Sequence, residues 1–307
     1  MADATTTTPS LPLVAPQARA VAPNEGAFRA TARRFVRDRF SLAATILFTL
    51  IVVASVAAPL ITDNVLRQNP NRGRLTQKFQ PPSAEHFFGT DELGRDQLAR
   101  LLHAGRVSLT VGFFAMVFSV AIGAALGILA AYYGGWVDDV INALIQIINN
   151  TPTLFFLIML SVVFRPGVLG LALLIGVLGW TGEARVIRAR VLSERRRDYV
   201  DAAILAGAHP TRVMFRHILP NVGSLVLLSA GGGMIGAILG EAGISYLGFG
   251  VQIPTASWGN MLSNSLSYPT VAPWLIVAPG LVVSLVILCL FQITDGLRDA
   301  LDPRLRG

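Results

Sequence analysis

The sequence predicts an all-α membrane protein with six transmembrane helices, and three observations support this fold class. Hydrophobic residues make up 53% of the 307 residues and charged residues only 14%, which is too apolar for a soluble domain of this length. The chain contains several long intervals without a charged side chain, and a helix needs about 20 apolar residues to cross a bilayer. Arginines gather between these intervals, as is typical of cytoplasmic loops.

The first 40 residues are predicted to be a cytoplasmic tail that ends in a basic stretch beside the membrane. Residues 1–40 contain a Thr run with scattered Pro and Ala, which indicates disorder, and no signal peptide is expected because no apolar core precedes a cleavage-like site. The basic stretch contains Arg29, Arg33, Arg34, Arg37 and Arg39. These charges favour a cytoplasmic N-terminus, and the first transmembrane helix is predicted at residues 41–62.

A long extracytoplasmic loop is expected at residues 63–105, because this stretch is too long for a simple turn. It contains Pro81-Pro82 and then a stretch rich in Gly and Asp. From Asp96 onward the pattern indicates a helix that leads into the second span. The side chain of Thr90 or Asp91 is expected to cap that helix.

The other five transmembrane helices are predicted within residues 106–297. Four charge-free intervals each fit one helix, and the third of these is expected to extend past Glu183 toward Arg185. The four intervals are 107–137, 140–164, 166–182 and 218–240. The following interval is too long for one span. Its start, residues 252–270, is rich in Ser, Asn, Thr and Pro and is expected to be a loop, so the sixth helix is predicted at 271–294.

Six spans from a cytoplasmic N-terminus place both ends of the chain in the cytoplasm. The inside segments are then the N-terminal tail, a turn near residues 134–138, a loop at 185–221 and a C-terminal tail at 298–307. They contain most of the 25 Lys and Arg residues, as the positive-inside rule requires. The positive net charge therefore reflects topology, and no nucleic-acid partner is expected. Cys289 is the single cysteine, so neither a disulfide nor a metal site is expected.

The loop after the fourth span has the pattern of a helix, a break and a second helix. Residues 198–206 are good helix formers, and Gly207 stands where a helix often ends in a left-handed residue. His209 is expected to cap the second helix and Pro210 to occupy its first position. Three apolar residues are expected on one face of that helix, with Pro220 closing it. They are Met214, Phe215 and Ile218.

A short amphipathic helix between two spans can transmit the movement of a bound partner protein to the spans on either side. The small residues Ala202, Ala203 and Gly207 would allow another backbone to approach closely. From the residues alone, an ordinary cytoplasmic loop packed on its own protein remains the alternative.

This loop resembles the "EAA" loop of ABC importer permeases, in which Glu-Ala-Ala is followed by Gly and later by Ile-x-Leu-Pro or a close variant. Asp201-Ala202-Ala203, Gly207 and Ile218-Leu219-Pro220 occupy these positions, with Asp in place of Glu at the first. The resemblance implies that the loop couples the chain to an ATPase. The residues implied in this coupling are Asp201, Ala202, Ala203, Gly207, Met214, Phe215, Ile218, Leu219 and Pro220.

Three further stretches resemble the C-type subunit of the permeases for dipeptides, oligopeptides, nickel and glutathione. They are 88–96 running on to 106–109, 241–250 followed by 257–262, and 295–305. Together with the loop, the resemblance covers about residues 35–305. It implies the type I ABC importer (MetI-like) permease fold, located in a bacterial inner membrane, with peptides as the transported molecules.

The resemblance also implies partners. These are a second permease subunit, two ATPase subunits or domains, an extracytoplasmic substrate-binding protein and membrane lipid. The only lysine, Lys78, lies outside any G-x-x-x-x-G-K pattern, so ATP and Mg²⁺ are expected on the partner ATPases and the chain is expected to be non-catalytic. Nickel and glutathione remain alternative cargoes. A stand-alone secondary transporter would show an internal repeat, which the sequence lacks, and a scaffold without transport is a more distant alternative.

Polar residues within the spans are candidates for the translocation path. Asn149, Asn150 and Thr151 precede Pro152, a helix-kinking residue, and hydrogen bonding between helices is the alternative role for them. Glu241 is expected either to line the path or to fix the turn that follows it. Glu183 and Arg185 are expected in the path or at the membrane interface. The candidate contacts of the binding protein are Asp91, Arg95 and Trp258, of which Trp258 is expected, like Trp274, at the membrane interface.

Overall fold

The computed structural model describes residues 25–301, and the outer parts of the two predicted tails, 1–24 and 302–307, lie outside the described residues. Throughout the described part the fold is helical, without strands. The helices are α1 (Glu25–Arg37), α2 (Arg39–Val56), α3 (Ala58–Leu60), α4 (Gln97–Tyr133), α5 (Gly135–Asn150), α6 (Thr153–Phe164), α7 (Val168–Glu194), α8 (Asp198–Leu205), α9 (Pro210–Arg212), α10 (Leu219–Tyr246), α11 (Trp258–Ser265) and α12 (Trp274–Leu301). Short π-helical turns follow α3 (Ile61–Leu66) and α9 (Val213–Ile218), and a 3₁₀ turn lies at Leu75–Gln77.

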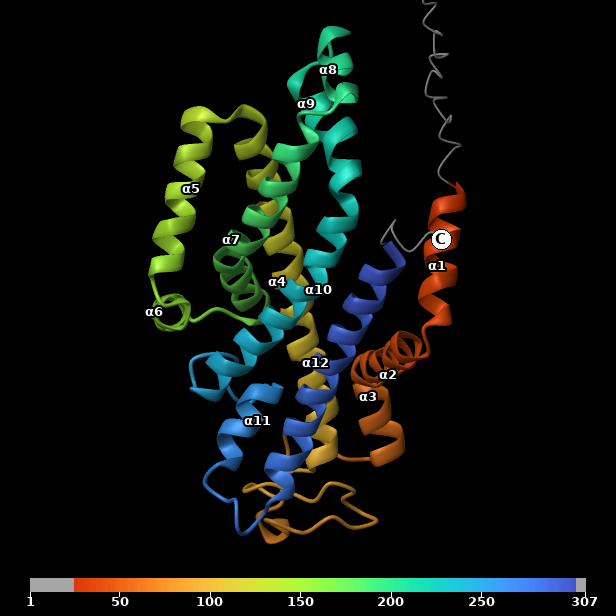
Figure 1. Ribbon diagram of the computed structural model, residues 1–307. Helices are drawn as coiled ribbons and strands as arrows, with labels where there is room; N and C mark the ends of the chain where they lie inside the picture. Colours follow the sequence, from red (N-terminus) through yellow and green to blue (C-terminus); the bar gives the residue numbers. More distant parts are fainter. Residues whose placement is uncertain (1–24, 302–307) are drawn as a thin grey trace, which may run out of the picture.

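Four long helices, α4, α7, α10 and α12, form the centre of the molecule (Figure 1). Helices α4 and α7 approach most closely because α4 presents glycines to the backbone of α7. A Cβ on Gly123 would lie 2.9 Å from the Trp180 carbonyl oxygen, and one on Gly127 would lie 2.7 Å from that of Ala184. Side chains at these two positions would therefore force the helices apart, which is the usual reason for small residues at helix contacts in membranes.

Within the described residues, five helical stretches are long and apolar enough to cross a membrane. They contain α2, α4, α7, α10 and α12. The predicted third span, in contrast, is broken into α5 and α6, which meet at an angle of 85°. The break is at Thr151 and Pro152, where proline cannot donate a helical hydrogen bond. The described part of the chain therefore has six candidate spans if this bent pair counts as one.

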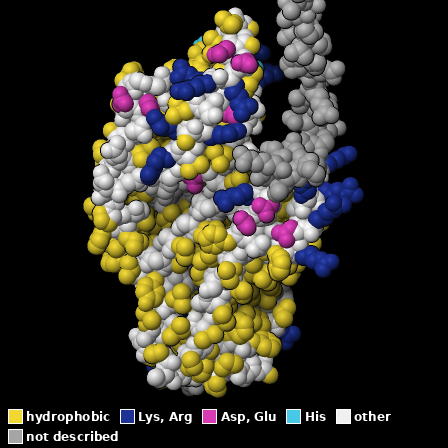
Figure 2. Space-filling view, in the orientation of Figure 1, with side chains coloured by type: hydrophobic (Ala, Val, Ile, Leu, Met, Phe, Trp, Pro, Cys, Tyr) yellow, Lys and Arg dark blue, Asp and Glu magenta, His cyan; other side chains and the backbone are white. Residues whose placement is uncertain are grey.

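The arrangement of the chain ends agrees with the predicted topology. Helix α1 and the C-terminal end of α12 lie toward the end of the molecule that carries α8, and the long loop (residues 67–96) lies at the opposite end (Figure 1). Figure 2 shows Lys, Arg, Asp and Glu side chains gathered around α8 and α1, while apolar side chains dominate the surface below them. Such an apolar surface suits contact with lipid hydrocarbon.

Four sequence predictions about local structure are corrected. Part of the predicted tail is helical, because α1 covers residues 25–37. Helix α4 is capped by Asp96, whose side chain accepts a hydrogen bond from the Ala99 N–H at 2.7 Å. Thr90 and Asp91 are not the cap because their side chains are used within the long loop. The polar stretch 252–270 contains α11, which a Ser257–Asn260 capping box starts.

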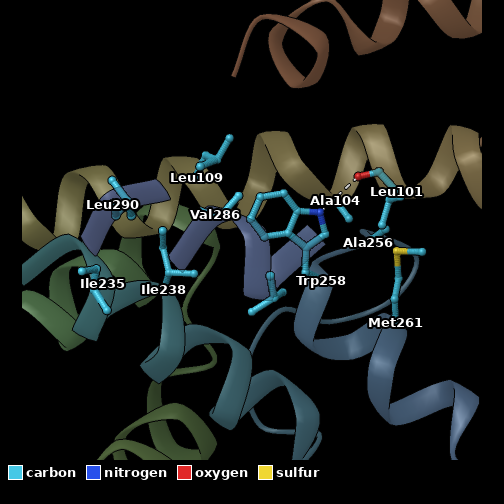
Figure 3. Packing of buried hydrophobic residues seen from close by; sticks show 11 residues of the cluster. Leu101, Ala104, Leu109, Ile235, Ile238, Ala256, Trp258, Met261, Val286 and Leu290 are labelled. Carbon is cyan, nitrogen blue, oxygen red and sulfur yellow. Dashed lines mark hydrogen bonds between the residues drawn. The ribbon is translucent and has the colours of Figure 1, made fainter. Parts of the chain in front are cut away.

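The fourth correction concerns Trp258, which was expected at the membrane interface. Its side chain is only 1% exposed and fills the space between α4, α10 and α12, where it packs among Leu109, Ile238 and Val286 (Figure 3). The indole N–H donates to the carbonyl oxygen of Leu101 at 3.3 Å. Its polar group is therefore satisfied inside the protein, as burial of a tryptophan requires. Trp274 is half-buried, and its indole N–H donates to the Thr90 carbonyl oxygen.

Candidate functional site

The α8–α9 segment (residues 198–220) forms one end of the molecule (Figure 1). Its first helix ends as the sequence predicts. Gly207 has a φ of +79°, its N–H donates to the Ile204 carbonyl, and the Ala208 N–H donates to that of Ala203. This pair of bonds is a Schellman motif, and its left-handed position favours glycine. The prediction for Gly207 is confirmed.

The second helix also begins as predicted, but it does not end at Pro220. The His209 side chain accepts from the Thr211 N–H, and Pro210 is the first helical residue. After the π-helical turn the chain continues directly into α10, with Pro220 in its first turn, where the missing N–H of proline is tolerated. The segment is therefore joined to α10 without a flexible link.

Buried apolar side chains anchor the α8–α9 segment to the bundle. Val200, Met214 and Ile218 pack in one cluster with residues of α4 and α7, among them Ile128 and Ile187. Because Met214 is 2% exposed and Ile218 fully buried, these two side chains do not form a surface for a partner. Phe215 is 58% exposed and does not share their face. Residues 213–218 form a π-helical turn, which holds more residues per turn than an α-helix, so Phe215 and Ile218 are not aligned as in an α-helix.

The exposed side of the segment forms an apolar tip, defined by Ile204, Leu205 and Phe215. Their side chains are 46%, 88% and 58% exposed. Asp201, Ala202 and Gly207 are exposed beside them, whereas Ala203 and Leu219 are half-buried. Sequence reasoning missed Ile204 and Leu205, although two large apolar residues separated from a helix-ending glycine only by Ala206 were the available signal.

Ion pairs brace the base of this segment. The Glu194 carboxylate, 2% exposed, pairs with Arg190 at 2.9 Å and with Arg197 at 3.1 Å. The Tyr199 hydroxyl donates to it at 3.2 Å, and burial together with the Glu194 charge raises the pKa of this hydroxyl, so that it remains a donor. Arg188 of α7 is paired with Asp138 of α5 at 2.6 Å. Ion pairs therefore connect α7 both to the start of the α8–α9 segment and to α5.

Three cavities follow one another along a single face of α7. The first, about 350 Å³, lies at Val168 and includes His103 and Arg106 of α4. The second, about 310 Å³, is lined by α7 from Ile175 to Glu183. The third, about 680 Å³, lies between α7, α10 and α12 and is also lined by Glu183. Gly232 of α10 lines both the second and the third cavity, which are called the inner cavities below.

The predicted path residues Asn149, Asn150 and Thr151 do not line these three cavities. The amide oxygen of Asn149 accepts from the Thr181 hydroxyl of α7 at 2.9 Å, and the Thr151 hydroxyl donates to the carbonyl of its own helix at Ile147. Asn150 is exposed. The contact of Asn149 is the hydrogen bonding between helices that was the alternative role for this group.

Glu241 is fully buried and lies outside the three cavities. Its carboxylate accepts from the hydroxyls of Ser108 on α4 and Ser245 on α10, both at 2.7 Å. The Ser245 oxygen in turn accepts from the Val251 N–H and the Ser108 oxygen from the Trp258 N–H. The contacts of Glu241 therefore match the second of its two expected roles, fixing the turn that follows.

Asp91 and Arg95 are also buried, at 4% and 6% exposure. The Asp91 carboxylate accepts from Arg95 Nε at 2.6 Å and pairs with Arg100 at 3.5 Å. With Trp258 buried as well, none of the three predicted binding-protein contacts offers its side chain to a partner. The exposed apolar residues at this end are others, notably Phe87, Leu93 and Ile253.

The fold and these contacts define a multi-pass integral membrane protein that presents a rigidly anchored apolar tip at one end and a folded loop at the other. Residues 123–307 match the family described as "Binding-protein-dependent transport system inner membrane component". The chain belongs to this family and is therefore a permease component located in the inner membrane. The matched residues include the α8–α9 segment and the faces of α7 and α10 that line the inner cavities.

Relatives with this family character cover nearly the whole chain. It is 35% identical to the dipeptide transport system permease protein DppC of Alkalihalophilus pseudofirmus, over 97% of this chain and 96% of that protein. It is 36% identical to the oligopeptide transport system permease protein OppC of Haemophilus influenzae, over 89% and 87%. The DppC protein of Bacillus subtilis is 35% identical over 89% and 85%.

Proposed function

We propose that this chain is the transmembrane permease subunit of an ATP-driven importer of di- or oligopeptides. The observation that carries the proposal is the apolar tip on its buried base. A partner that binds Ile204, Leu205 and Phe215 can move the α8–α9 segment. Because Met214 and Ile218 pack against α4 and α7, this movement is transmitted to the helices around the cavities. The relatives, which are named dipeptide and oligopeptide transport system permease proteins, support peptides as the cargo.

The partners that grip the tip are proposed to be ATPase subunits on the cytoplasmic side. The chain contains no P-loop pattern around its single lysine, so ATP and Mg²⁺ bind on those partners and this chain is non-catalytic. One chain supplies one α8–α9 segment, while two ATPases offer two grooves. A second permease chain therefore completes the pore, and the resemblance to heteromeric importers supports a chain that differs from this one.

Transport is proposed to proceed by alternating access. Movement of the ATPases shifts the tip, and the rigid junction with α10 tilts the helices that line the cavities, which opens them to one side and then the other. An extracytoplasmic binding protein delivers the peptide at the end that carries the long loop, where Phe87, Leu93 and Ile253 are exposed.

Uptake measurements test this function. In cells without redundant importers, deletion of this chain is expected to abolish uptake of labelled dipeptides or oligopeptides, and re-expression to restore it. Glutathione and nickel uptake serve as parallel measurements in the same strains. Restoration of glutathione or nickel uptake, with peptide uptake unaffected throughout, would contradict the proposed cargo.

A further inference from the structure

Among the described residues, Glu183 is the one carboxylate that lines both inner cavities. It stands near the middle of the face of α7 that follows the three cavities, and the backbone of α10 makes room for it. A Cβ on Gly233 would lie 3.2 Å from its Oε1 atom. The Ser229 hydroxyl lines the larger cavity beside it. The carboxylate therefore faces the cavities rather than the packed interior of the bundle.

This carboxylate lacks a cationic partner among the described residues. Asp138 and Glu194 are each paired with arginine, and Glu241 is held by two serines. For Glu183, in contrast, no Lys, Arg or His nitrogen of the described part lies within 4.0 Å. Arg298 lines the same cavity but does not pair with it.

The surroundings of Glu183 favour a cationic ligand. Part of the larger cavity has an apolar wall, which includes Val186, Leu225, Leu228 and Phe291. The polar residues that line it besides Glu183 are Ser229, Gln292, Thr294, Asp295 and Arg298. A carboxylate in such surroundings interacts more strongly with a positive charge than it would in water. The volume of about 680 Å³ falls within the range of small-molecule sites, in which a few polar groups fix the orientation of a ligand in a largely apolar pocket.

We infer that Glu183 binds a protonated amine of the transported molecule as it passes through the cavities. The inference rests on the proposed function and adds a specificity-determining residue to it. Two groups of a peptide have this chemistry, the terminal ammonium and the side-chain ammonium of lysine. The rest of the molecule meets the glycine and apolar part of the wall, while Gln292, Thr294, Asp295 and Arg298 are the further polar groups of the larger cavity.

The test is transport by the complete importer, reconstituted in proteoliposomes with a saturating amount of peptide-loaded binding protein, so that the rate reports steps after delivery. Three versions of one peptide are compared: a free-amine peptide with central norleucine, its N-acetylated form, and the N-acetylated form with central lysine. The variant is Glu183→Gln. Glu183→Asp keeps the charge, and Asp139→Asn removes an exposed carboxylate outside the cavities.

Glu183→Gln is expected to lower the maximal rate for the free-amine peptide about tenfold, equivalent to about 1.4 kcal/mol, and to leave the uncharged acetylated peptide unchanged. A tenfold loss for the acetylated lysine peptide as well would show that either ammonium is recognised. Both control variants are expected to retain the discrimination of the wild type. Copurification of the partner subunits verifies that each variant assembles.

The inference is overturned if Glu183→Gln changes the rates for all three peptides by the same factor, or changes none of them. An identical factor would mean that Glu183 supports the helix arrangement or pairs with a neighbouring subunit. Failure of the wild-type importer to transport any of the peptides would instead contradict the proposed function.

Discussion

Leu205→Asp is expected to abolish association of the ATPase subunits with this chain while its membrane helices remain folded. Leu205 is 88% exposed at the end of α8, so the substitution disturbs no packing within the chain. In a protein interface, however, it removes apolar contact area worth about 1.5–3 kcal/mol and adds a charge that loses its hydration. A total of about 4 kcal/mol corresponds to roughly a thousandfold weaker association.

Copurification of the ATPases with the tagged chain, together with peptide-stimulated ATP hydrolysis, measures this effect. Ser193→Asp is the matched control, because it adds the same charge at an exposed position near the end of α7 outside the apolar tip. Deletion of residues 208–216 would be a poorer test, since it also removes the buried Val213 and Met214. Normal copurification of Leu205→Asp would refute the assignment of the tip.

Asp91→Ala is expected to unfold the long loop locally, with a cost of about 3–5 kcal/mol. The substitution leaves the buried guanidinium groups of Arg95 and Arg100 without this carboxylate, and it removes the acceptor of the Leu93 and Arg95 N–H groups. Unpaired buried charges are far more costly than the loss of an exposed pair. Uptake is expected to fall as well, because the loop belongs to the end proposed to receive the binding protein.

Limited proteolysis of the long loop and the thermal unfolding midpoint of the purified complex measure the change. Glu92→Ala is the control, because Glu92 is more exposed and, within residues 25–301, pairs only with Arg95, at 2.9 Å. It is expected to cost no more than about 1 kcal/mol. Equal proteolytic sensitivity of the two variants would contradict the role assigned to Asp91.

The main helices of the bundle could be predicted from the sequence because the bilayer imposes a simple requirement on it. Each of the stretches that contain α2, α4, α7, α10 and α12 carries a long apolar window, and length and hydropathy are local properties. The same is true of Gly207 and His209, whose roles depend on neighbours within five residues. The break between α5 and α6 was signalled by Pro152, but its angle was not.

The candidate site could be predicted only in part. The α8–α9 segment was recognised from its pattern, yet Met214 and Ile218 were placed on one face with Phe215. Met214 and Ile218 face inward because apolar residues of α4 and α7 lie there, and Leu205 remains outside because no other element covers it. The position of Leu205 near the helix-ending Gly207 was a local signal, but which apolar side chains a distant helix covers is not encoded locally.

What the sequence by itself determined is therefore the set of apolar spans, the helix ends at special residues and the family pattern of the α8–α9 segment. The tertiary structure alone decided which polar groups form hydrogen bonds or ion pairs inside the protein. Asp91, Trp258 and Glu241 find their partners inside the protein, partly through residues more than 100 positions away. Glu183, in contrast, faces the cavities and forms no ion pair with another described residue. The physical reason is that the length of an apolar span depends only on consecutive residues. Whether a buried polar group finds a hydrogen-bond partner depends on which distant elements the fold brings beside it.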